Sequence, residues 1–97
     1  MTNSDLFVAI LDTVARECEV SPQDILGSRR TIEIVDARYL LVFFLSFAGF
    51  NTPAISRRTN LSPQCINQIL RQFPDRRKQS GKLFELTFQR IRNDLEM

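Results

Sequence analysis

Two helix-start signals stand ten residues apart in the middle of this 97-residue chain. Each joins a hydroxyl side chain that can cap a helix to a proline suited to the first helical position, in the pairs Thr52-Pro53 and Ser62-Pro63. Helices that begin so close together require a sharp turn between them. Asn60 lies where this turn needs a residue that tolerates a positive φ. The pattern predicts two short helices joined by a tight turn.

The second of these helices carries a row of polar side chains at spacings of three and four residues: Gln64, Asn67, Gln68 and Arg71. Residues at such spacings share one helix face. Carboxamides can pair with the N6 and N7 edge of adenine, and an arginine can bind guanine or a phosphate. We therefore interpret 52–72 as a DNA-binding helix-turn-helix with these four residues reading bases. The alternative is an ordinary solvated helix surface.

Charge is divided unevenly along the chain. Residues 1–48 hold four basic and seven acidic side chains, whereas residues 49–97 hold nine basic and four acidic ones. A positive half that contains the helix-turn-helix favours attraction to a polyphosphate. Arg57 and Arg58 are candidate phosphate contacts, and further basic residues could add nonspecific attraction: Arg76, Arg77, Lys78 and Lys82. The alternative for each is a solvated positive surface.

Helical periodicity extends over the rest of the sequence, and no strand pattern occurs. A capping box at Thr2 and Asp5 opens a first helix that ends near Cys18. A short helix follows over 21–27, and a long central helix over about 33–48. Pro74 is expected to break the chain before a last helix over about 76–96. The predicted fold is a single domain over 1–97, an all-α compact bundle of about six helices.

Several classes of function are disfavoured by the composition. The chain has no histidine, and its two cysteines, Cys18 and Cys65, are far apart, so no metal site is expected. Without a histidine base or an activated cysteine, we expect no enzyme, no cofactor and no small-molecule substrate. The longest apolar run, 39–50, is too short to cross a membrane. The absence of a disulfide framework favours the cytoplasm.

From about Val20 onward, the sequence resembles the C-terminal DNA-binding domain of the bacterial replication initiator DnaA, a member of the TrpR-like superfamily. The resemblance lies in the order of three segments: 20–30, with a short helix and basic loop; 34–38, entering the long helix; and 53–56, opening the helix-turn-helix. It implies sequence-specific binding of double-stranded DNA in replication or transcription regulation. The chain has no phosphate-binding GxxxxGK[ST] loop, so no ATPase activity is expected.

The resemblance also implies roles for three arginines. Arg29 and Arg30 of the basic loop would contact the phosphate backbone or enter the minor groove, and Arg38 would hold a phosphate. The planar donor fork of arginine suits both tasks. The alternatives are solvated loop charges for the first two, and for Arg38 an intramolecular pair with Asp36 or Glu33.

At the start of the recognition helix the chain departs from the family. It has residues 60–65, Asn-Leu-Ser-Pro-Gln-Cys, where the family has a Gly-Gly-Arg-Asp-His-Thr-Thr-like stretch. This departure motivates an alternative function, a protein-interaction or dimerisation module that keeps the fold without recognising DNA. The C-terminal helix carries an apolar stripe that a homodimer could use: Phe84, Phe88, Ile91 and Leu95. Such stripes more often pack into the core of their own chain.

Overall fold

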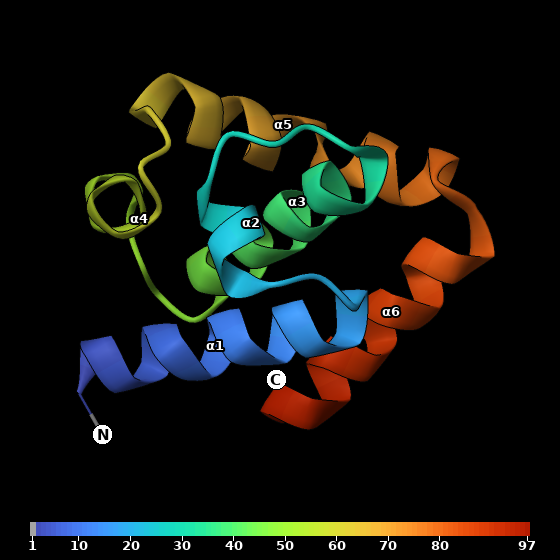
Figure 1. Cartoon of the computed structure of the whole chain (residues 1–97), viewed down its shortest axis with the longest axis horizontal. Coiled ribbons are helices and arrows are strands. Elements are labelled where there is room, and N and C mark those ends of the chain that lie inside the picture. The colour runs from blue at the N-terminus through green and yellow to red at the C-terminus, as the bar shows by residue number, and fades with distance from the viewer. Residues whose placement is uncertain (1) are drawn as a thin grey trace.

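The computed structural model describes residues 2–97, which form helices and their connections without any strand. The helices are α1 (Asn3–Cys18), α2 (Pro22–Leu26), α3 (Ile32–Phe47), α4 (Thr52–Thr59), α5 (Pro63–Gln79) and α6 (Gly81–Leu95). The all-α bundle predicted from the sequence is confirmed. In Figure 1, α3 lies in the middle, with α1 below it and α5 above it. None of the described helices has both the length and the apolar character needed to span a membrane.

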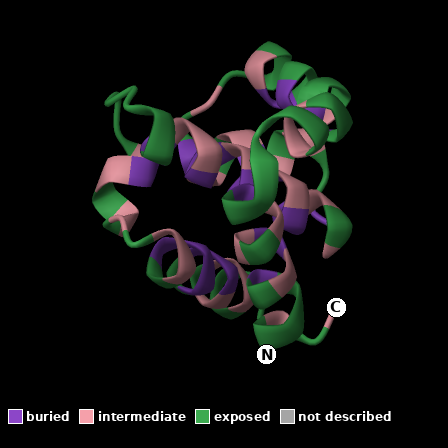
Figure 2. Ribbon diagram, turned by 90° about the vertical axis from the view of Figure 1, so that its right-hand side faces the viewer, coloured by how far each residue is buried: buried purple, intermediate pink, exposed green. Residues whose placement is uncertain are grey.

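Helix α3 is the centre of the core because it packs against four others: α1, α2, α4 and α5. Its apolar residues are buried on more than one side, and Phe44 is only 1% exposed. The Phe44 ring lies 5.2 Å from the ring of Phe88 on α6, which joins the last helix to the same core. Figure 2 shows buried residues on the inward faces of the helices and exposed residues outside.

Most helix starts follow the capping signals in the sequence. Thr2 and Asp5 form the expected capping box, and Ser21 and Ser62 accept bonds from Asp24 N and Cys65 N at 3.1 Å. The start of α4 differs from the expectation. Its cap is Asn51, whose Oδ1 accepts the amide of Ala54 at 2.9 Å, so Thr52 and Pro53 fall inside the first turn. Asparagine is at least as good a cap as threonine, and the first helical turn tolerates proline.

The expected break at Pro74 is wrong, because α5 continues through it to Gln79. A proline inside a helix removes one backbone hydrogen bond. Packing of the helix segments before and after the proline can outweigh this cost. Phe73 is 3% exposed on the core side of this segment. The chain turns instead at Gly81, whose φ of +86° suits glycine, and α6 therefore begins later than the predicted residue 76.

Two of the basic residues expected to attract phosphates are engaged within the protein. Arg77 donates from Nε and Nη2 to the Glu85 carboxylate at 2.6 and 2.8 Å, while its guanidinium covers the Phe88 ring at 4.1 Å. The Arg77 bond, together with one from Gln89, lowers the pKa of Glu85 to about 2. Arg76 pairs with Asp36 of α3 at 2.7 Å. Both arginines fasten α5 to its neighbours.

Candidate nucleic-acid interface

The turn between α4 and α5 has the geometry that the sequence predicted. Asn60 adopts φ +62°, and its amide donates to the carbonyl of Ser56 at 3.2 Å. The Ser56 hydroxyl in turn donates to the carbonyl of Leu61 at 2.7 Å. Beneath the turn, Ile55 and Ile66 are fully buried, so the two helices share one piece of core. Helices α4 and α5 therefore form a rigid helix-turn-helix unit.

All four predicted base-reading residues are exposed on the first half of α5: Gln64, Asn67, Gln68 and Arg71. Within residues 2–97, three of these side chains have no hydrogen-bond or ion-pair partner. The exception is Asn67, whose Oδ1 accepts the hydroxyl of Thr52 at 3.1 Å. Bidentate pairing with adenine uses both the amide oxygen and the amide nitrogen. Gln64 and Gln68 are therefore better placed for such pairing than Asn67.

The second half of α5 is anchored on α3 by a cluster of contacts that was not predicted from the sequence. The Tyr39 hydroxyl donates to Gln72 Oε1 at 2.8 Å, and Arg76 lies 4.2 Å from the Tyr39 ring. Arg76 Nε also donates to Asp36 at 2.8 Å. These contacts join residues more than thirty positions apart, and no local pattern indicates them. They fix the direction in which the exposed face of α5 points.

The helix-turn-helix that carries the exposed face of α5 has no acidic side chain in α4 or in the first half of α5. Between Asp36 and Asp75 the sequence has neither aspartate nor glutamate, and this stretch includes α4 and the first half of α5. Phosphates approaching the helix-turn-helix would meet no carboxylate from these elements. This absence of acidic residues can be seen in the sequence itself, although it matches no known motif.

The two arginines of α4 differ in their surroundings. Arg58 is half-buried, with its guanidinium 5.5 Å from the centre of the Phe50 ring. Arg57 is exposed and lines a groove with Asn3 and Leu6 at the start of α1. Neither side chain is placed against α5 by a described contact. Both add positive charge to the region and stay candidate phosphate contacts.

Arg29 and Arg30 are exposed on the loop between α2 and α3. Arg29 forms an ion pair with Asp24 at 3.5 Å, and its side chain remains 66% exposed. Exposed pairs of this kind are weak, so a phosphate can displace the carboxylate. In Figure 1 the loop crosses the same upper side of the molecule along which α5 runs.

Arg38 does not have the phosphate-binding role that the resemblance implied. It is 8% exposed, and its guanidinium donates three hydrogen bonds to backbone carbonyls at the end of α2. Neither Asp36 nor Glu33, the alternatives expected from the sequence, is its partner. Burial lowers the pKa of Arg38, the charge of Arg30 lowers it further, and Cys65 of α5 has an opposing effect. Arg38 therefore joins α3 to the end of α2.

The apolar stripe of α6 belongs to the core. Phe84 and Phe88 are each 5% exposed, and Ile91 is fully buried. Leu95 is half-buried and packs against the same core. The stripe is therefore not available on the surface of the folded chain as a homodimer interface.

The described residues show no candidate metal centre, and Cys18 is not an activated thiol. Within residues 2–97, no three histidine, cysteine, aspartate or glutamate side chains are arranged to hold a metal ion. Burial raises the pKa of the Cys18 thiol to about 12, with the charges of Asp36 and Glu17 acting in the same direction. A thiol with such a pKa is protonated at neutral pH and is a weak nucleophile.

No family model, curated protein or solved structure matches this chain. The resemblance to the DnaA domain therefore rests on the sequence segments alone. The features that bear on function are the helix-turn-helix, the exposed face of α5 and the distribution of charge.

Proposed function

We propose that the chain binds double-stranded DNA by placing the first half of α5 in the major groove. The observation that carries this proposal is the exposed face of α5, where Gln64, Gln68 and Arg71 have no side-chain partner within residues 2–97. Their amide and guanidinium groups can form hydrogen bonds with base edges. The turn and the anchor on α3 hold the helix that carries them in one orientation, as base reading requires.

Phosphate contacts in this proposal come chiefly from the basic loop. Arg29 and Arg30 are exposed, and the loop lies on the same side of the molecule as α5 (Figure 1). The start of α5 offers few free amide groups, because Pro63 has no amide hydrogen and the Cys65 amide is used by Ser62. The amide of Gln64 is the first-turn donor left for a phosphate. By analogy with the DnaA domain, the binding would serve replication or transcription regulation.

Salt dependence tests the proposal. Arg29, Arg30 and Arg71, with support from the arginines of α4, would neutralise about three to five phosphates. Raising salt from about 50 to 200 mM should then weaken binding to a random duplex on the order of 100-fold. Fluorescence anisotropy with a labelled duplex measures this change. Absence of binding at the lower salt concentration would reject the proposal.

A protein-interaction module is the second candidate, and a different surface supports it. Phe47 is 63% exposed and lines a groove with Phe43, Leu70 and Phe73, next to Pro74. Exposed apolar surfaces of this kind often bind other proteins. A substitution of Phe47 that abolishes biological activity, while substitutions on the α5 face leave it intact, would favour this candidate over DNA binding.

A further inference from the structure

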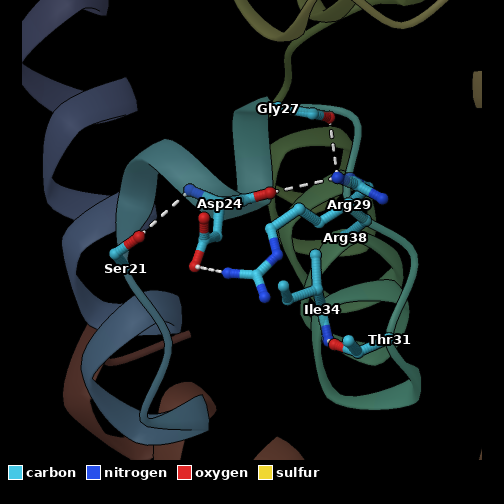
Figure 3. Close-up of polar contacts among 7 residues, drawn as sticks. All are labelled: Ser21, Asp24, Gly27, Arg29, Thr31, Ile34 and Arg38. Carbon is cyan, nitrogen blue, oxygen red and sulfur yellow. Dashed lines mark hydrogen bonds and ion pairs between the residues drawn. The ribbon is translucent and has the colours of Figure 1, made fainter.

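Arg38 links three carbonyl groups at the end of the shortest helix. Its Nε donates to the carbonyl of Ile25 at 2.7 Å. Its Nη2 donates to the carbonyls of Asp24 and Gly27 at 3.0 and 2.7 Å, as Figure 3 shows. The last carbonyls of a helix have no partner within the helix. The planar fork of one buried arginine therefore supplies donors that the five-residue helix α2 lacks.

The same contacts fix one end of the basic loop. Gly27 is the first residue after α2, and Thr31 caps α3 by accepting the amide of Ile34 at 3.4 Å (Figure 3). Arg29 and Arg30 lie between these two held ends. Helix α2 is too short to be stable by itself, so its end and the loop depend on tertiary contacts.

We propose that Arg38 is a positioning residue of the DNA interface, which it serves without touching DNA. It holds the loop so that Arg29 and Arg30 are presented on the side of the molecule along which α5 runs (Figure 1). This inference rests on the proposed DNA binding. Fixing the loop before binding reduces the conformational entropy lost when the two arginines contact phosphates. Lysine cannot replace arginine here, because a single ammonium group lacks the fork that spans these carbonyls.

The first test uses the protein without DNA. Arg38→Met keeps an apolar stem but removes all three hydrogen bonds. We expect backbone order parameters of residues 28–30, measured by ¹⁵N relaxation, to fall from about 0.85 to below about 0.6, with those of α3 and α5 unchanged. Arg38→Lys should behave like Arg38→Met. An unchanged loop in Arg38→Met, or normal order in Arg38→Lys, overturns the positioning role.

The second test is a double-mutant cycle on duplex binding. Arg38→Met should weaken binding on the order of tenfold in the wild-type background. In a background of Arg29→Ala with Arg30→Ala it should cause almost no further loss, because no loop arginine remains to be positioned. An equal loss in both backgrounds would mean that Arg38 acts independently of the loop, and would overturn the inference.

Thr31→Ala gives a second variant if Arg38→Met does not fold. It loosens the other end of the loop by removing the cap of α3, and it should lower affinity in the same background-dependent manner. Equal losses with and without Arg29 and Arg30 would again contradict positioning. If the wild-type protein binds no duplex while Arg38→Met still disorders the loop, the DNA role fails and Arg38 is a structural clamp only.

Discussion

Replacing Phe44 with alanine is expected to lower the free energy of unfolding by about 3–5 kcal/mol. The ring is 1% exposed and lies 5.2 Å from those of Phe43 and Phe88, so its removal opens a cavity where α3 meets α6. Small domains have about 5–15 kcal/mol of stability in total, and the variant should therefore be close to unfolding. Urea denaturation followed by circular dichroism measures the loss.

Phe47→Ala is the matched control, because it also removes a phenylalanine ring, about one helical turn further along α3. Phe47 is 63% exposed and stacks on Phe43 with a centroid distance of 6.1 Å. Its replacement should cost about 1 kcal/mol or less. Similar losses for the two variants would show that the core is not centred on the inner face of α3.

Replacing Gln68 and Arg71 together with alanine should weaken binding to a selected target duplex by about 100-fold, because a good bidentate base contact contributes about 1–3 kcal/mol of discrimination. The target is obtained by selection from a random oligonucleotide pool. Binding to unrelated duplexes should fall much less, since only one positive charge is lost. Anisotropy titrations against both duplexes give the two ratios.

The control for this pair is Lys78→Ala with Gln79→Ala, which removes the same types of group from the far end of α5. Both residues are exposed, but they lie beyond the first half of α5, which is the part proposed to enter the major groove. The control should retain specificity and lose only a little affinity. Equal losses of specificity from both pairs would contradict base reading by the first half of α5.

Local chemistry explains which features could be predicted from the sequence. The positive φ of Asn60 and the cap at Ser62 depend on residues within a few positions, and both were predicted correctly. The exposure of Gln64 and Gln68 followed from the helical period once the buried face had been recognised. These features define the helix-turn-helix and its outward face.

Distant partners explain what the sequence could not indicate. Arg38 is held by carbonyls of α2, and Arg77 by Glu85, so neither is the free cation that its position suggested. The same reasoning applies to Pro74, where packing of Phe73 and the ion pair of Arg76 sustain the helix. A carbonyl acceptor has no sequence signature, and ion pairs across helices cannot be distinguished from solvated charges before the fold is known.

Mapping the amide signals of the ¹⁵N-labelled protein during addition of a short duplex at low salt tests the proposed interface most directly. We expect chemical-shift changes in residues 62–72 and in the loop 28–31, with the exposed faces of α1 and α6 unaffected. Changes centred instead on Phe43 and Phe47, or no change in any amide signal, would contradict DNA binding through α5.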